Sequence, residues 1–203
     1  MKTLAVLLFA LSLNLLPNPT HSTFNPIRLP TADDTPVLDT DGDELRAGGV
    51  YIIASGPVEV SLSRIRASTC PNVVSIASFS RGVPVTITPA DPNATVISPS
   101  TYLSFSFNNV CAKKLYWLVD RYPESETKSP YFVNAGDFLP NNSNQFKIEA
   151  EPNSNRNAYK ITYCHFGSDE CNNVSSRFYA WLRSSRLVLS DKPFVVVFKK
   201  ANN

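Results

Sequence analysis

The sequence predicts an all-β domain, and three observations support this. Twelve short runs rich in β-branched and aromatic residues recur between turn residues from position 37 onward. Several of them alternate apolar and polar residues, as strands with one buried face do. Prolines lie mostly at the ends of the runs, where a missing N–H costs little.

The expected strands follow the chain in order. Valine and isoleucine dominate the early runs, aromatic residues the middle ones, and the run 102–107 sets Leu103, Phe105 and Phe107 on one face against two serines on the other. Only the stretch 175–186 has apolar residues at helical spacing, and because it is brief and rich in serine we expect strand or irregular structure there. The twelve runs are 50–54, 58–62, 73–79, 83–88, 102–107, 115–120, 131–133, 145–150, 158–163, 178–182, 186–189 and 194–199.

The composition of the 203-residue chain excludes several classes of function. Lys and Arg number 19 against 17 Asp and Glu, so the chain lacks the basic excess that nucleic-acid phosphates reward. Its apolar content of 43% is too high for a disordered protein. We therefore expect a folded domain without a nucleic-acid partner.

The N-terminus has the organisation of a secretory signal peptide over residues 1–22: one lysine, an apolar run at 4–16, then small and polar residues. That run is shorter than the roughly 20 apolar residues of a membrane-spanning helix, and no later run approaches that length, so no membrane partner is expected. We interpret the proline-containing segment 23–34 as a propeptide and 35–203 as the folded domain.

In a secreted chain, four cysteines predict a disulfide framework; they are Cys70, Cys111, Cys164 and Cys171. Three connectivities are possible from the sequence. A short polar stretch separates Cys164 from Cys171, so a local bridge is natural and would leave Cys70 with Cys111. No C-x-x-C pattern occurs and His165 is the one histidine after the signal, so we expect no metal and no cofactor.

The same residues argue against an enzyme. A serine or cysteine hydrolase activates its nucleophile with a base, usually histidine, and His165 adjoins a cysteine expected in a disulfide. The G-x-S-x-G, phosphate-loop and dinucleotide patterns are absent, and nothing singles out a glycosidase pair of acids. The acidic run 39–44 fits a calcium loop poorly, because Gly42 comes too early and Val50 stands where a glutamate is needed. We interpret this run as a turn between strands.

The acidic run also carries a family resemblance. Val-Leu-Asp-Thr-Asp-Gly-Asp-Glu-Leu at 37–45, followed by Tyr-Ile-Ile at 51–53, resembles the N-terminal motif of the plant Kunitz family of the soybean-trypsin-inhibitor type. The likeness covers essentially 37–199, and the four cysteines fall in the family's order. It implies a monomeric β-trefoil of about twelve strands with the disulfides Cys70–Cys111 and Cys164–Cys171. The other matching segments are 146–148, 157–161, 186–190 and 192–198.

Segments 15–19, 24–31 and 87–92 resemble those of the family's vacuolar storage members. This implies a dual role, nitrogen storage and inhibition of serine proteases such as trypsin. It also implies passage through the secretory pathway to the vacuole, with a vacuolar sorting receptor as a partner. The segment that the receptor would read is Asn25, Pro26, Ile27, Arg28 and Leu29.

An inhibitor of this kind presents an exposed loop already in the extended shape that a protease binds, so little entropy is left to lose. The family's reactive loop lies between the first two cysteines and before the strand expected at 83–88. We assign it to Arg81, Gly82, Val83 and Pro84, because trypsin's pocket takes Arg or Lys and Arg81 is the one basic residue there. The 40 residues between the first two cysteines also allow Val83 or Pro84 at the key position, and the plain alternative for Arg81 is a solvated turn residue. Strong family inhibitors support the loop with an asparagine amide, whereas Ala47 at the matching position has nothing to donate, so weaker inhibition is expected.

Three sequons predict N-glycosylation at Asn93, Asn141 and Asn173. Other functions stay open beside storage with trypsin inhibition: storage without inhibition, inhibition of cysteine or aspartic proteases, and a sugar-binding module. The last would call for a repeated carbohydrate-site pattern that this chain lacks. The fold alone does not choose among the rest.

Overall fold

A computed structural model describes residues 35–65, 68–78, 82–120, 130–137, 145–152, 157–165, 170–180 and 184–201. These residues form twelve strands and no helix, so nothing in the described chain is a helix able to cross a membrane. The strands are β1 (Val50–Ser55), β2 (Val58–Ser63), β3 (Val73–Ser78), β4 (Val85–Pro89), β5 (Leu103–Val110), β6 (Lys113–Asp120), β7 (Phe132–Gly136), β8 (Phe146–Ala150), β9 (Tyr159–Cys164), β10 (Cys171–Tyr179), β11 (Ser184–Ser190) and β12 (Val197–Lys200).

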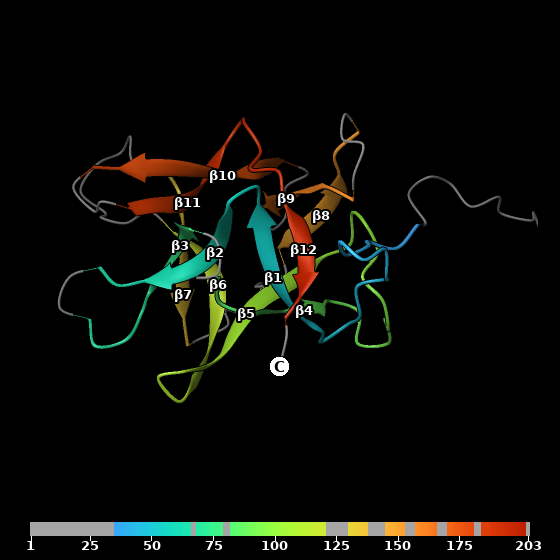
Figure 1. Ribbon diagram of the computed structural model, residues 1–203, viewed down its shortest axis with the longest axis horizontal. Coiled ribbons are helices and arrows are strands. Elements are labelled where there is room, and N and C mark those ends of the chain that lie inside the picture. Colours follow the sequence, from blue (N-terminus) through green and yellow to red (C-terminus); the bar gives the residue numbers. More distant parts are fainter. Residues whose placement is uncertain are drawn as a thin grey trace, which may run out of the picture.

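Six of the strands pair in a closed, barrel-like ring. β1 pairs with β4, β4 with β5, β5 with β8 and β8 with β9, all antiparallel. The bridge between Tyr159 and Val196 joins β9 to the residue before β12, and β12 pairs with β1, beside which it lies in Figure 1. Closure satisfies backbone groups that an open sheet would leave at its edges.

The other six strands form three hairpins, β2–β3, β6–β7 and β10–β11. The hairpins contact one another through the pairs β3–β7, β7–β11 and β3–β11. Each hairpin continues from a ring strand, since β1 pairs with β2, β5 with β6 and β9 with β10. The unit of ring strand, hairpin and ring strand therefore occurs three times along the chain.

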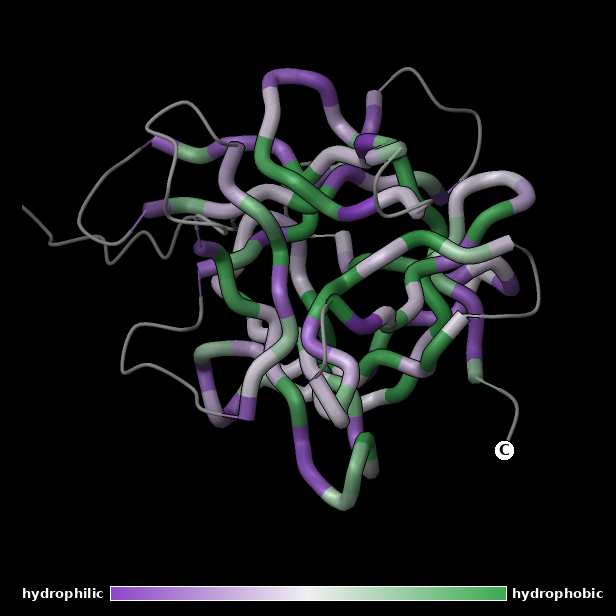
Figure 2. Tube along the Cα trace, turned by 90° about the vertical axis from the view of Figure 1, so that its left-hand side faces the viewer, coloured by the Kyte–Doolittle hydropathy of each residue, from purple (hydrophilic) through white to green (hydrophobic). Residues whose placement is uncertain are grey.

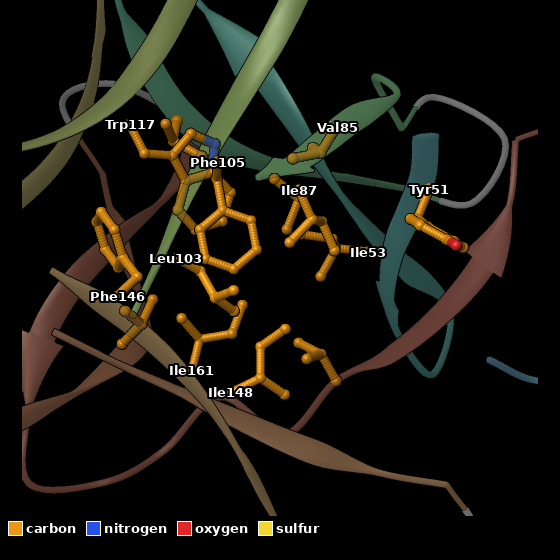
Figure 3. Packing of buried hydrophobic residues seen from close by; sticks show 14 of the residues in the cluster. Tyr51, Ile53, Val85, Ile87, Leu103, Phe105, Trp117, Phe146, Ile148 and Ile161 are labelled. Carbon is orange, nitrogen blue, oxygen red and sulfur yellow. The ribbon is translucent and has the colours of Figure 1, made fainter. Parts of the chain in front are cut away.

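Aromatic and aliphatic side chains from both the ring strands and the hairpins form the hydrophobic core. Phe105 stacks on Trp117 with ring centroids 4.7 Å apart, and Phe146 meets both rings edge-on at 5.6 and 5.7 Å (Figure 3). All three side chains are almost fully buried, and each fully buried large apolar side chain stabilises the fold by roughly 1.5–3 kcal/mol. Figure 2 shows the hydrophobic stretches running inside, with hydrophilic ones concentrated at the outer bends.

The observed strands overlap all twelve predicted runs, and one run was clearly misplaced. The tenth run was predicted at 178–182, whereas β10 begins at Cys171 and ends at Tyr179. Its first half is polar and lacks the alternating pattern, so cross-strand pairing with β11, from Asn173 opposite Ser190 onward, fixes it as strand. This is a case of tertiary context overriding local preference.

Two disulfides connect the cysteines in the pairing that the family resemblance implies. Cys164 and Cys171 lie directly opposite each other on β9 and β10. Cys70, just before β3, is bonded to Cys111 in the turn between β5 and β6. Each disulfide lowers the conformational entropy of the unfolded chain, which in the chain-entropy model stabilises the fold by about 2–4 kcal/mol.

Candidate functional site

The segment 82–84, the described part of the predicted inhibitory loop, enters β4 and lies against β2. The backbone N–H of Val83 donates to the carbonyl oxygen of Val60 at 3.0 Å. The N–H of Gly82 donates to Oε2 of Glu59 at 2.9 Å. Gly82 and Val83 are half-buried and Pro84 is exposed, so this end of the loop is fixed to the body of the fold. Arg81 itself lies outside the described residues.

Glu59 is the buried carboxylate beneath this segment, and sequence reasoning missed it. It is the one charged residue of β2 and is 6% exposed. A buried charge is tolerated when it is paired, and Oε1 of Glu59 lies 3.3 Å from Nζ of Lys199 on β12. One side chain thereby ties β2, β12 and the loop together. A single acid within a run of valines was the only sequence signal for it.

Close approach to Glu59 also explains why position 82 is glycine. A Cβ atom at that position would lie 2.8 Å from Oε2 and 2.9 Å from Cβ of Glu59. It would also lie 3.0 Å from Cγ2 of Ile52 on β1. The packing therefore requires a residue without a side chain.

Ala47, the position expected to support the inhibitory loop, lies against a different segment. Its N–H donates to the carbonyl oxygen of Thr95 at 3.0 Å, and the neighbouring Arg46 forms a bridge with Val96. Segment 82–84 enters β4 and segment 91–96 follows it, so the two lie at opposite ends of a five-residue strand, about 16 Å long at the usual rise. The structure therefore does not bring the described part of the predicted loop to Ala47.

The segment beside Ala47 forms a tight, exposed turn. The side-chain Oδ1 of Asp91 accepts the N–H of Asn93 at 2.9 Å, and its carbonyl oxygen accepts the N–H of Ala94 at 3.2 Å. The N–H of Ile97 then donates to the carbonyl oxygen of Leu45 at 2.8 Å. No Lys or Arg occurs from 89 to 101, so this segment offers trypsin's pocket no basic side chain.

The three sequons differ in their surroundings. Asn93 is exposed in that turn. Asn173 on β10 is half-buried, and its Nδ2 donates to the carbonyl oxygen of Asp191 at 2.9 Å. Asn141 lies outside the described residues, as do the residues of the predicted sorting segment, Asn25 to Leu29.

The acidic run forms a turn around the terminal strand's Lys200. Asp39 is fully buried, and its Oδ1 accepts the N–H groups of Asp41 and Asp43, both at 2.9 Å. Nζ of Lys200 lies 3.6 Å from Asp39 and 3.7 Å from Asp41, and it donates to Asp43. That hydrogen bond lowers the pKa of Asp43 and raises the pKa of Lys200. The positive charge near these three carboxylates is thus the ammonium group of Lys200. Across the described ranges, no cluster of potential ligands could hold a metal ion.

His165 is in packing contact with two tyrosines. Its ring meets Tyr131 and Tyr163 edge-on, with centroids 5.7 and 5.3 Å apart. The arrangement accounts for the histidine as a packed ring beside the Cys164–Cys171 bridge.

Residues 37–200 match the sequence profile of the Kunitz legume family, described as trypsin and protease inhibitors. Sporamin B and sporamin A of Ipomoea batatas are 49% and 44% identical to the chain, each comparison covering 98% of both proteins. The trypsin inhibitor BvTI of Bauhinia variegata is 30% identical over 82% of this chain and 96% of its own.

Solved structures show the same fold. The Kunitz-type cysteine protease inhibitor PCPI-3 from potato superposes with a TM-score of 0.71 at 28% identity, covering 84% of this chain and 99% of its own. Soybean trypsin inhibitor in complex with porcine trypsin gives 0.68 at 23% identity, covering 83% of this chain and 100% of its own. The second likeness concerns the fold alone.

Proposed function

The chain belongs to the Kunitz legume family of trypsin and protease inhibitors, and on that premise we propose that it inhibits trypsin-like serine proteases with a substrate-like loop. We infer further that the fold is a monomeric β-trefoil. The threefold repeat of ring strand, hairpin and ring strand supports the trefoil. No catalytic activity, cofactor or metal is part of this proposal.

We assign the loop to Arg81, Gly82, Val83 and Pro84. The observation that carries the assignment is the fixed backbone of Gly82 and Val83 directly after the loop's one basic residue. A loop already ordered in the free protein loses little entropy when a protease binds it. Arg81 would fill the pocket that takes a basic side chain in trypsin.

A second candidate is inhibition of another protease class through segment 91–96. The contact between Ala47 and Thr95 favours it, because the resemblance places the loop support at Ala47. Because no Lys or Arg occurs from 89 to 101, this segment has no basic side chain for trypsin's specificity pocket. The likeness to a potato cysteine protease inhibitor gives the class to test.

A panel of proteases tests both candidates. Purified protein is titrated against trypsin, a papain-type cysteine protease and a pepsin-type aspartic protease, with residual activity as the readout. Stoichiometric loss of trypsin activity alone supports the first candidate. Inhibition of the cysteine or aspartic enzyme alone supports the second, and inhibition of none of them leaves storage as the function.

We also propose that the protein is a reserve protein of the vacuole. The signal-like residues 1–22, the segment Asn25 to Leu29 and the similarity to the sporamins over nearly the whole chain support this. In plant cells, a fluorescent fusion of the full chain is expected in the vacuole. Deleting residues 25–29 is expected to redirect the fusion to the medium, and vacuolar delivery of the deleted chain would contradict the role of the sorting receptor.

A further inference from the structure

We propose that the cavity lined by residues of the segment 89–102 is a sugar site. Its occupant is the first N-acetylglucosamine of a glycan on Asn93, which packs on Tyr102. Three features meet here: a sequon on an exposed turn, a cavity beside that turn, and an exposed aromatic ring in the cavity wall. The proposal goes beyond protease inhibition and does not depend on which loop inhibits.

The cavity has the size and lining that a sugar requires. Its volume of about 400 Å³ lies within the roughly 300–1,000 Å³ of ligand sites in proteins. The walls are mostly apolar, with Pro89, Ala94 and Val96 among them, and the carboxylate of Asp91 adds a hydrogen-bond acceptor. The ring C–H groups and the acetyl methyl group of N-acetylglucosamine pack on apolar surface, while its hydroxyl and amide groups hydrogen-bond to polar atoms.

Hydrogen bonds hold the cavity walls in place without a ligand. The backbone N–H of Ala90 donates to the carbonyl oxygen of Tyr102 at 2.8 Å, which closes the base of the loop between β4 and β5. Oγ1 of Thr101 donates to the carbonyl oxygen of Ser98 at 2.7 Å and closes the second turn of the loop. Because the cavity is already formed, little of the chain has to become ordered when a sugar enters.

Tyr102 is the aromatic platform of the cavity. Its side chain is 44% exposed, and in the described part of the chain only Val50 and Phe178 are large apolar residues of comparable exposure. Nζ of Lys147 on β8 lies 4.5 Å from the centroid of the Tyr102 ring, a cation–π contact that restrains the ring, and Lys147 does not line the cavity. The C–H face of a sugar that covers this ring removes apolar surface from water.

Asn93 attaches the sugar beside the cavity. Asp91 and Ala94, on either side of Asn93 in the turn, both line the cavity. Oδ1 of Asp91 accepts the N–H of Asn93 at 2.9 Å, so the attachment point is held by a residue of the cavity wall. A tethered sugar has an effective concentration on the order of millimolar, so it fills a cavity that binds the free sugar only weakly. The bound sugar would also cover segment 91–96, which the second candidate function presents to a protease.

Thermal unfolding of protein made in plant cells tests the site. The glycans are kept in the high-mannose form and trimmed with an endoglycosidase that leaves one N-acetylglucosamine on each occupied asparagine, so only first sugars are compared. We expect Asn93→Gln to melt about 2–4 °C below the native chain, the shift that a modest contact gives in a protein of this size. Thr95→Ala removes the sequon but keeps Asn93, and it is expected to melt with Asn93→Gln.

A substitution of Tyr102 separates the proposed contact from a general effect of the glycan. In a Tyr102→Ser background, we expect Asn93→Gln to lower the melting temperature by less than half as much as in the native chain. Phe178→Ser is the matched control, because Phe178 on β10 is 64% exposed and does not line the cavity. In that background the full loss is expected. Tyr102→Leu keeps an apolar side chain without the flat ring and replaces the serine variant if that variant does not fold.

Two results would overturn the proposal. One is an unmodified Asn93 in the native chain, which mass spectrometry detects. The other is an equal loss of melting temperature on removing the Asn93 sugar in the native and Tyr102-substituted chains. Neither measurement involves a protease, so both leave the proposed inhibition standing, and failure to inhibit any protease would leave the sugar site standing.

Discussion

The backbone N–H of Ala47 donates to the carbonyl oxygen of Thr95 at 3.0 Å, which places Ala47 at the end of β4 opposite to the entry of Gly82. The position expected to support an inhibitory loop and the loop with the basic residue are therefore separated by a strand. This relationship makes the two candidate loops experimentally distinct.

The substitution Ala47→Asn tests which of the two candidate loops, 81–84 or 91–96, inhibits trypsin. The new amide would lie beside segment 91–96 and could order only that segment. If Arg81 enters the protease, we expect the inhibition constant for trypsin to change less than twofold. Tighter inhibition by about tenfold or more would instead identify 91–96 as the inhibitory segment.

Gly82→Ala tests the fixed end of the proposed loop. The added Cβ would press on Glu59 at 2.8 Å and on Ile52 at 3.0 Å, and we expect a loss of about 1–3 kcal/mol in the free energy of unfolding. Urea denaturation measures it, with Ser78→Ala, at the exposed end of β3, as the control. Equal stability of the Gly82 variant and the control would contradict the close approach.

Lys200→Met tests the turn of acidic residues. The pKa of Asp43 is lowered mainly by its hydrogen bond with Lys200, so the native state holds its proton less tightly than the unfolded chain. The stabilising effect of this contact is therefore present above the ordinary Asp pKa of 3.8 and is lost as the pH falls through the lowered value. We expect the variant's melting temperature to be lower at pH 7, with a smaller further decrease on acidification. If the melting temperatures of the native protein and of Lys200→Met fell by the same amount as the pH was lowered, the role of Lys200 would be refuted.

Asn93→Gln and Asn173→Gln test the sequons. Asn93 lies exposed in a turn, whereas the amide of Asn173 is held by the carbonyl of Asp191 at 2.9 Å. For protein made in plant cells, we expect the first substitution to remove one glycan and the second to change nothing. The mass before and after glycosidase treatment gives the count, and a glycan lost only with Asn173 would reverse the assignment.

Much of the fold could be predicted because the strands carry their own signal. The alternation of Leu103, Phe105 and Phe107 identifies β5, and all three side chains are fully buried in the ring. The start of β10 could not be predicted, because its polar residues become strand only through pairing with β11. Local pattern is enough where burial and periodicity coincide, and insufficient where a partner strand decides.

The site was less accessible to sequence reasoning. The basic residue of the proposed loop could be named from chemistry. The Glu59 carboxylate that accepts the N–H of Gly82 could not, because it lies 23 positions from Gly82 in the sequence and comes near only in the folded chain. Likewise, the separation of Ala47 from Gly82 follows from the direction of β4 between them. Contacts of this kind depend on topology, which single residues do not encode.

The most direct test of the account is a titration of trypsin with the native protein, Arg81→Ala and Arg64→Ala. Arg64 is exposed just after β2 and provides a charge-matched control. The account predicts that the alanine at 81 weakens the inhibition constant at least about 30-fold, equivalent to about 2 kcal/mol for a dominant contact residue, while Arg64→Ala matches the native protein. Equal inhibition by all three proteins would contradict the claim that Arg81 occupies the protease pocket.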